Sequence, residues 1–301
     1  MTFPDEVFLA AATAALDLDP PGWDWDVLDS LELWSCTGLG DEDERAGFAA
    51  LFVAQGETLR STAGLSALMA QAVLTHPGRA AATYGARSDG HDIVVHAAPE
   101  VVHADLAVIL LPDSVGTADP AALRPAGGAS IDPAVVSTWR IDRCDVTPIE
   151  APSPDDAALT LPRLAAALEM LGAARRGFEL ACTYAADRRQ FGRPISDFQA
   201  VRHLLAEGLV HVRLLADACA LTLEQPTTDR AILLKALAGR NGRAALQVAQ
   251  QVFGGIGFTT EHVLHRHQAR VLALDAVLGT SAQLTRQLGL AGAVPSTPRL
   301  D

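Results

Sequence analysis

Two arginines and an aromatic ring stand together where the sequence passes from one helical segment to the next. The run 188–195 reads Arg-Arg-Gln-Phe-Gly-Arg-Pro-Ile. Apolar residues recur every three or four positions on both sides of it, which is the period of a helix. Gly192 can adopt a positive φ, and Pro194 suits the first turn of the next helix. Such a bend offers charge and a ring to a planar, anionic ligand, although an ordinary helix connection with solvated arginines has the same composition.

Small residues gather at two places further along the chain. Gly254, Gly255 and Gly257 follow an alanine-rich helical segment. Their N–H groups could face an anion, although a helix C-cap followed by a turn has the same composition. The second place is Gly279-Thr280 before another helical segment, where the hydroxyl can cap the helix or meet a phosphate oxygen.

The composition indicates a helical, globular protein. Of its 301 residues, 49% are hydrophobic, 20% are charged and only 5% are aromatic, which favours helices over sheets. The net charge of -13 argues against nucleic acid as a partner. We expect neither a signal peptide nor a membrane span, because the first residues are acidic and no apolar run approaches roughly 20 residues. Four cysteines without metal-type spacing fit a cytoplasmic location.

Periodicity divides the chain into three predicted domains. Residues 1–78 are expected to be helical. Residues 79–150 change to short β-rich runs and predict a small β domain that packs on the helices. Residues 151–301 predict an antiparallel four-helix bundle with short connections. The predicted fold is therefore mainly α, with one reduced β module.

Several boundaries can be predicted within these domains. A short helix is expected at 24–33, and the helix that follows the acidic run after Gly40 could end at Gly56. Strands are expected at 92–96 and 105–111, and a third one begins at Val135.

Taken together, the three clusters resemble the acyl-CoA dehydrogenase family of flavoproteins. The resemblance rests on Arg188-x-Gln190-Phe191-Gly192-x-Pro194-Ile195 with Phe198-Gln199, on Gln251-x-x-Gly254-Gly255-x-Gly257-Phe258, and on Gly279-Thr280. It is strong from about residue 161 to 288, fainter from 25 to 69 and poor in the β region. It implies a helical domain, a β domain and a four-helix bundle, with FAD as cofactor and the α,β-dehydrogenation of an acyl-CoA thioester as the reaction.

The resemblance also implies which residues touch the cofactor. One set would contact the adenosine-pyrophosphate half of an FAD seated mainly in a neighbouring subunit: Arg188, Gln190, Phe191, Gln251, Gly254 and Gly255. Thr280 would reach an FAD bound within its own subunit. The chemistry agrees, because arginine pairs with a pyrophosphate and glycine admits it closely.

Removal of the α-proton requires a carboxylate beside the α carbon. Most of the family carries a glutamate immediately before the Gly-Thr pair, and that position here is Leu278. A minority places the glutamate near the start of the first bundle helix, and that position here is Pro162. Neither side chain can take a proton.

Asp275 and Glu169 are weaker candidates for the base. Asp275 lies about one helical turn before the usual position, and Glu169 about two turns into the first helix. We expect both to form surface ion pairs instead, Glu169 with Arg163 or Arg175 and Asp275 with Arg270.

Two polar groups are expected to be solvated helix surface. One contains Glu261, His262, His265 and His267, whose spacing does not suit a metal, so no metal site is predicted. The other contains Lys235, Arg240 and Arg243, which could alternatively meet a CoA phosphate.

These observations predict one subunit of an α2β2 acyl-CoA dehydrogenase that is inactive alone, because its base is missing while its cross-subunit FAD motifs remain. A paralogous subunit would supply the glutamate, most of the isoalloxazine pocket and the acyl-CoA site, and bulky thioesters such as steroid side-chain CoA esters would be substrates. The electron-transfer acceptor is not indicated. Two alternatives stay open: a self-sufficient homo-oligomer with an unorthodox base, and a flavin-free acyl-CoA-binding or structural scaffold.

Overall fold

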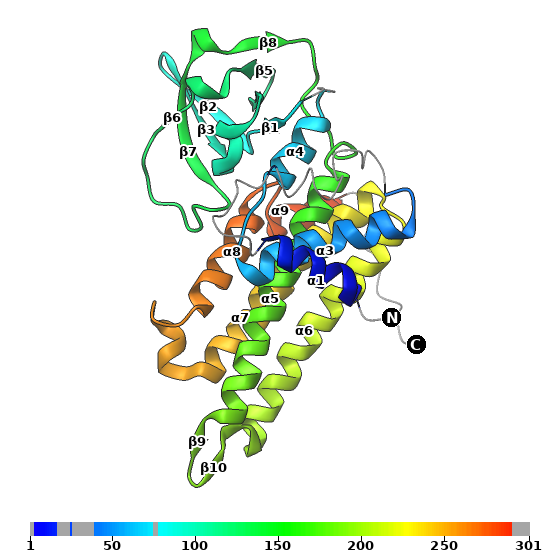
Figure 1. Cartoon of the computed structure of the whole chain (residues 1–301), viewed down its shortest axis with the longest axis vertical. Helices are drawn as coiled ribbons and strands as arrows, with labels where there is room; N and C mark the ends of the chain where they lie inside the picture. The colour runs from blue at the N-terminus through cyan, green and yellow to red at the C-terminus, as the bar shows by residue number, and fades with distance from the viewer. Residues whose placement is uncertain (1–2, 17–24, 26–38, 75–77, 291–301) are drawn as a thin grey trace.

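The computed structural model describes residues 3–16, 25, 39–74 and 78–290 (Figure 1). Helices occupy both the first and the last part of the chain, and two small sheets lie between them, at the upper end of the molecule in this view. The predicted fold class is confirmed. The helix expected at 24–33 lies outside the described residues apart from Trp25, which is buried.

The N-terminal part contains, within its described residues, the helices α1 (Glu6–Leu16), α3 (Glu42–Thr58) and α4 (Gly64–Gln71). Asp41 caps α3 by accepting a hydrogen bond from the backbone N–H of Glu44 at 2.8 Å. The expected end of this helix at Gly56 is wrong, because the helix continues to Thr58. Gly56 is instead the point where α3 meets a bundle helix, and an added Cβ would stand 2.0 Å from the carbonyl oxygen of Glu169.

The β region contains two four-stranded sheets, ordered β1-β4-β5-β8 and β2-β3-β7-β6. Only β1 and β4 pair in parallel, and the other strand pairs of these sheets are antiparallel. The strands are β1 (Ala80–Ala82), β2 (Gly85–Asp89), β3 (Asp92–Ala97), β4 (Leu106–Leu110), β5 (Val115–Ala118), β6 (Arg124–Pro125), β7 (Ser137–Asp142) and β8 (Thr147–Ile149).

The third expected strand begins two residues later than predicted. The backbone N–H groups of Val135 and Val136 both donate to the carbonyl of Asp132. This turn uses the donors that a strand would need, so pairing starts at Ser137.

The C-terminal part is a bundle of long antiparallel helices: α5 (Thr160–Asp187), α6 (Gln199–Glu224), α7 (Thr228–Phe253) and α8 (Leu264–Ala276). A hairpin of β9 (Arg189–Gln190) and β10 (Arg193–Pro194) connects α5 to α6, and a short 3-10 helix, η6 (Gly254–Phe258), follows α7. A last helix, α9 (Ser281–Leu290), packs on α7 through Leu284 and Leu288.

Close backbone contact joins the N-terminal helices to the bundle. A Cβ at Gly172 in α5 would stand 2.0 Å from the carbonyl oxygen of Val53 in α3. Glycine is therefore required there by the approach of the two helices. Within the described part of the chain, no helix has both the length and the apolar character needed to cross a bilayer.

Candidate functional site

A pocket of about 480 Å³ lies where the β region meets the bundle. The β region contributes Tyr84, Leu110 and Pro112, and the bundle contributes Arg163, Leu278 and Gln283. Its walls are mostly apolar, and Arg163 is the one charged residue among the described side chains that line it. The pocket can therefore hold a large apolar group beside a single cation.

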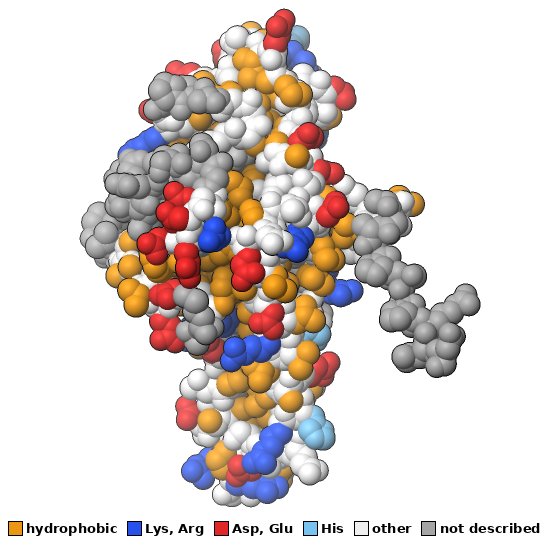
Figure 2. All heavy atoms as spheres, turned by 90° about the vertical axis from the view of Figure 1, so that its right-hand side faces the viewer, with side chains coloured by type: hydrophobic (Ala, Val, Ile, Leu, Met, Phe, Trp, Pro, Cys, Tyr) orange, Lys and Arg blue, Asp and Glu red, His pale blue; other side chains and the backbone are white. Residues whose placement is uncertain are grey.

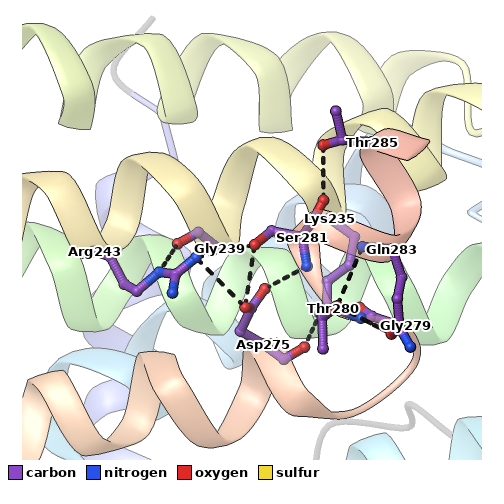
Figure 3. Close-up of polar contacts among 9 residues, drawn as sticks. All are labelled: Lys235, Gly239, Arg243, Asp275, Gly279, Thr280, Ser281, Gln283 and Thr285. Carbon is purple, nitrogen blue, oxygen red and sulfur yellow. Dashed lines mark hydrogen bonds and ion pairs between the residues drawn. The ribbon is translucent and has the colours of Figure 1, made fainter. Parts of the chain in front are cut away.

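Leu278 stands on the pocket wall in a short loop between α8 and α9. Its φ of 61° lies in the left-handed region, which is unfavourable for a branched residue. Buried cations hold the loop in place through its carbonyl groups. Lys235 Nζ donates to the carbonyls of Asp275 and Gly279 at 3.3 and 3.1 Å (Figure 3). Arg163 Nε donates to the carbonyl of Leu278 at 3.2 Å.

Asp275 clamps the same loop to α9 (Figure 3). Its two carboxylate oxygens accept hydrogen bonds from Ser281, one from the backbone N–H at 2.9 Å and one from Oγ at 3.2 Å. Arg243 Nη2 lies 3.8 Å from the carboxylate and donates to Ser281 Oγ at 3.1 Å. A Cβ at Gly239 would stand 2.0 Å from the carboxylate, so α7 can approach it only with glycine at this position. Asp275 does not line the pocket.

Glu169 belongs to a buried ionic cluster away from the pocket lining. Its Oε1 accepts a hydrogen bond from Arg270 Nη1 at 2.6 Å. Arg270 also donates to Asp132 Oδ2 at 2.6 Å and to the carbonyls of Arg60 and Leu59 at 2.8 and 3.1 Å. Burial raises the pKa of Glu169, and the charge of Arg270 only partly offsets this. Burial lowers the pKa of Arg270, but the two carboxylates outweigh it and raise that pKa overall.

The ion pairs expected for the two carboxylates are therefore wrong. Glu169 pairs with Arg270 from α8 and not with an arginine of its own helix. Asp275 interacts with Arg243 from α7 and not with Arg270. Sequence spacing suggested neighbours along one helix, whereas the bundle brings together charges from different helices.

Arg163 follows Pro162, the second position at which a base was considered. Pro162 is buried in the first turns of α5. The side chain of Arg163 is 5% exposed, and its Nη2 donates to Asp156 Oδ1 at 2.7 Å. Its Nη1 is shielded from solvent and has no hydrogen-bond partner among the described residues. The sequence analysis did not single out this residue as part of a site.

The prediction of a solvated stripe is wrong for Lys235, whereas Arg240 and Arg243 are exposed as expected. Lys235 is fully buried, and burial lowers its pKa to about 8, an effect that the nearby Asp275 partly opposes and the nearby Arg163 reinforces. Arg243 is engaged with Ser281 and Asp275. Carbonyls at the end of a helix lack intrahelical donors, and Lys235 provides one for the carbonyl of Asp275 near the end of α8.

Thr280 forms a capping box at the start of α9 (Figure 3). Its backbone N–H and its hydroxyl donate to Gln283 Oε1 at 2.9 and 3.0 Å, and its hydroxyl accepts the backbone N–H of Gln283 at 3.2 Å. This reciprocal arrangement stabilises a helix N-terminus. A ligand oxygen at Thr280 would have to compete with the side chain of Gln283.

The hairpin between α5 and α6 projects from the opposite end of the bundle (Figure 1). Phe191 is 91% exposed at its tip and has a φ of 52°. Its ring meets Phe198 edge-on at 6.2 Å, and the guanidinium of Arg193 lies over Phe198 at 4.2 Å. Arginine side chains, coloured blue, gather at this end of the surface (Figure 2). Arg188 and Gln190 are exposed beside them.

The glycine turn after α7 lies at the same end. Phe253, the last residue of α7, packs on Tyr184 near the end of α5 with ring centroids 4.9 Å apart. Gly254 ends the helix with a φ of 63°. Gly255 has no positive φ, and a Cβ there would meet no atom within 4 Å. No contact with the described residues therefore requires glycine at 255, and Gln251 beside it is exposed.

The predicted cofactor-contact residues thus occupy two separate places. Arg163, beside the pocket, and Arg188, at the hairpin, are 25 positions apart along α5, which corresponds to about 38 Å. Thr280 lies at the pocket end, and the other six residues lie at the hairpin end. The two sets cannot contact the same part of one cofactor molecule.

The histidines near α8 do not converge on one point. His262 Nδ1 accepts the backbone N–H of Leu264 at 3.1 Å, and His265 Nδ1 lies 2.7 Å from the carbonyl of His262. His267 is only 2% exposed, so its predicted solvation is wrong. Burial, followed by nearby arginines, lowers the pKa of His267 to about 4. Among the described residues, no group of three potential ligands could hold a metal ion.

Residues 156–291 match the family model of the acyl-CoA dehydrogenase C-terminal domain. This match covers slightly less than half of the chain, so residues 156–291 are similar to that domain. IpdE2 of Mycobacterium tuberculosis, an acyl-CoA dehydrogenase, is 32% identical over 164 residues, which cover 53% of this chain and 49% of that protein. IpdE2 of Mycolicibacterium smegmatis is 34% identical over 134 residues, covering 44% and 42%. The matches thus span about half the length of these relatives or less.

Solved structures extend the likeness over the acyl-CoA dehydrogenase fold as a whole. The steroid acyl-CoA dehydrogenase Tcur3481-Tcur3483 (G363A variant) has a TM-score of 0.70 and 20% identity, with 96% of each chain covered. The ChsE4-ChsE5 complex of Mycobacterium tuberculosis has a TM-score of 0.68 and 19% identity, with 98% of this chain and 99% of that chain covered. At this identity the likeness establishes the fold.

The matched region, residues 156–291, contains both positions considered for the base and all residues expected to touch FAD. The sequence analysis missed the pocket wall formed by the β region, including Tyr84 and Leu110. The sequence does contain one signal for this wall, because Pro112 follows the end of a predicted strand. A segment that leaves a sheet is commonly exposed and available to line a site.

Proposed function

We propose that this chain is a subunit of a hetero-oligomeric, FAD-dependent acyl-CoA dehydrogenase and that it lacks a catalytic base of its own. The observation that carries the proposal is Leu278. This apolar side chain lines the interdomain pocket at the loop position where the resemblance places the glutamate. No carboxylate belongs to the described lining of that pocket. Asp275 and Glu169 are both engaged elsewhere in hydrogen bonds, which weakens the case for a self-sufficient enzyme.

The hairpin end supports a role in binding a cofactor across an interface. It presents exposed Arg188 and Phe191 beside the open backbone at Gly255. An arginine can pair with a diphosphate, a ring can stack, and a glycine without internal packing admits close approach. These residues fit the adenosine-pyrophosphate half of an FAD held mainly by a neighbouring subunit. When bound, FAD would supply the hydride acceptor for dehydrogenation.

The roles of this chain's own residues follow from their positions. Arg188 and Gln190 would hold the diphosphate, Phe191 would cover the adenosine, and Gln251 and the glycine turn would border the same group. At the other end, Lys235 and Arg163 keep the loop of Leu278 in place, so an apolar wall faces the pocket. Proton abstraction would be the task of a glutamate in the partner subunit.

The partner is proposed to be a paralogous acyl-CoA dehydrogenase subunit that retains the glutamate. Two similar structures are named as pairs, Tcur3481-Tcur3483 and the ChsE4-ChsE5 complex, and the first is described as a steroid acyl-CoA dehydrogenase. By extension, the substrates of the assembly would be bulky acyl-CoA thioesters, including steroid side-chain esters. The mostly apolar pocket of about 480 Å³ is compatible with a bulky group.

Co-purification tests this proposal. The chain is produced alone and together with a paralogous subunit that carries the glutamate, and bound flavin and thioester oxidation are measured for each preparation. We expect flavin and activity only in the complex, and replacement of the partner's glutamate by glutamine to abolish turnover. A lone chain that binds flavin and oxidises thioesters, with turnover lost in Asp275→Asn or Glu169→Gln, would contradict the missing base. A complex without flavin would contradict the cofactor role.

Substitutions at the hairpin test the interface separately. The double variant Arg188→Ala/Phe191→Ala should lower flavin occupancy of the complex about tenfold or more, because it removes a charge-assisted contact and a stacking surface. Arg213→Ala is the matched control, since Arg213 is an exposed arginine on α6 away from both motifs. Equal flavin occupancy in the two variants would show that the hairpin does not touch the cofactor.

A further inference from the structure

Arg163 is a buried cation with spare hydrogen-bonding capacity. Two of its three nitrogens are used, Nη2 by Asp156 and Nε by the carbonyl of Leu278. Nη1 has no partner among the described residues and is shielded from solvent. Nearly all buried polar groups in folded proteins have a partner, so an unsatisfied guanidinium nitrogen indicates a missing acceptor.

The charges around this arginine leave an excess of positive charge. The cations are Arg163, Lys235 and Arg243, and the carboxylates are Asp156 and Asp275. Lys235 is fully buried and bonds only to carbonyl oxygens among the described residues, so no carboxylate neutralises it at hydrogen-bond distance. Three cations against two carboxylates favour the entry of one further anion.

The pocket offers the place where such an anion could meet Arg163. Arg163 is the one charge among its described lining residues, and the surrounding wall includes Leu110, Leu278 and Leu284. An arginine binds a carboxylate through strong, directional hydrogen bonds. The wall also contains polar side chains, among them Gln283 and Gln287, but its leucines beside a single cation favour a ligand that has an apolar body and one anionic group.

We propose that this pocket binds a hydrophobic carboxylate, with the carboxylate on Arg163 and the apolar body against the leucines. This inference concerns the same pocket as the proposed function, but it requires neither a bound flavin nor a partner subunit, so a binding test on this chain alone can fail independently of that proposal. The ligand class includes free hydrophobic acids and larger molecules that carry a carboxylate on an apolar ring or chain. Asp156 competes with the ligand for the same guanidinium, so it sets the affinity.

The test uses the full chain and two probes of the same shape, cyclohexanecarboxylate and cyclohexanecarboxamide. Their binding is measured by saturation-transfer NMR and by titration. We expect the carboxylate to bind about tenfold or more tightly than the amide, because charge-assisted hydrogen bonds are roughly twice as strong as neutral ones. Equal affinities, or no binding of either probe, would overturn the proposal.

Two substitutions with opposite expected effects make the test specific. Arg163→Gln should abolish the preference for the carboxylate, whereas Asp156→Asn should increase carboxylate affinity several-fold and leave the amide unchanged. Arg213→Gln is the control, because Arg213 is an exposed arginine on α6 that does not line the pocket. Circular dichroism checks folding of each variant. If Arg163→Gln fails to fold, Asp156→Asn still decides, and no gain in carboxylate affinity would refute the assignment.

Discussion

Replacement of Arg270 by methionine should cost more stability than any replacement of a surface arginine. The Arg270 side chain is 1% exposed and joins three parts of the chain: Asp132 of the β region, Glu169 of α5 and the carbonyls of Leu59 and Arg60 after α3. Methionine fills much of the same volume but leaves two carboxylates and two carbonyls without this donor. Breaking a buried ion pair on one side costs about 3–5 kcal/mol.

Urea unfolding followed by far-ultraviolet circular dichroism measures this cost. The matched control is Arg175→Met, which removes an arginine from a pair with Glu57 whose side chains are 21% and 17% exposed. Since water can replace part of that interaction, we expect a loss of about 1 kcal/mol. The double variant Glu169→Met/Arg270→Met should be no less stable than Arg270→Met alone, because it removes an uncompensated buried carboxylate.

Glu169→Met alone should also cost about 3 kcal/mol or more, so the double-mutant cycle predicts a coupling free energy of about 3 kcal/mol between Glu169 and Arg270. A loss below about 1 kcal/mol for Arg270→Met, or one equal to that of Arg175→Met, would refute the reasoning. Such a result would mean that the three parts of the chain are held together by apolar packing alone.

Three further predictions concern stability. Burial lowers the pKa of His267 to about 4, so the unfolded state binds more protons than the folded state below about pH 6.5. The free energy of unfolding should therefore fall by about 3 kcal/mol as the pH drops from 6.5 to 4. This fall should be smaller in His267→Gln, and the same pH dependence in that variant would contradict the prediction. Gly172→Ala should destabilise the protein by several kcal/mol, because its Cβ would meet a backbone oxygen at 2.0 Å. The control Gly289→Ala in α9, where an added Cβ would meet no atom within 4 Å, should stabilise the protein by up to about 1 kcal/mol. If the melting temperatures of the two variants moved in the same direction, the close contact at Gly172 would be refuted. Thr280→Ala should cost about 1 kcal/mol by removing the capping box with Gln283, and a neutral result in urea unfolding would mean that water replaces the cap.

The helical half of the fold was predictable from local patterns. Apolar residues at threes and fours marked the long helices, and Gly192, with a φ of 81°, marked the bend between α5 and α6. The position of Leu278 followed from the Gly-Thr motif after it. These features depend on residues close together in the sequence, and the sequence therefore carries them directly.

The partners of the buried charges were not predictable in this way. Lys235 was expected on a solvated stripe, yet it lies beneath the end of α8, where it donates to carbonyls of residues 40 and 44 positions away. Arg270 meets Glu169 across 101 positions. Such contacts depend on how the helices pack, and local spacing contains no information about which face of a helix meets another element.

Hydrogen bonds from other parts of the chain hold Leu278 in its left-handed backbone conformation. A left-handed conformation costs a branched residue about 1–2 kcal/mol, and hydrogen bonds from Arg163 to its own carbonyl and from Lys235 to the carbonyl of Gly279 offset that cost. The backbone would therefore present any side chain at this position to the pocket. A carboxylate introduced by Leu278→Glu would stand near Arg163, and a neighbouring guanidinium lowers the pKa of a carboxyl group. The introduced group would be a weak base, so this substitution alone should restore little thioester oxidation even if a flavin were bound beside it.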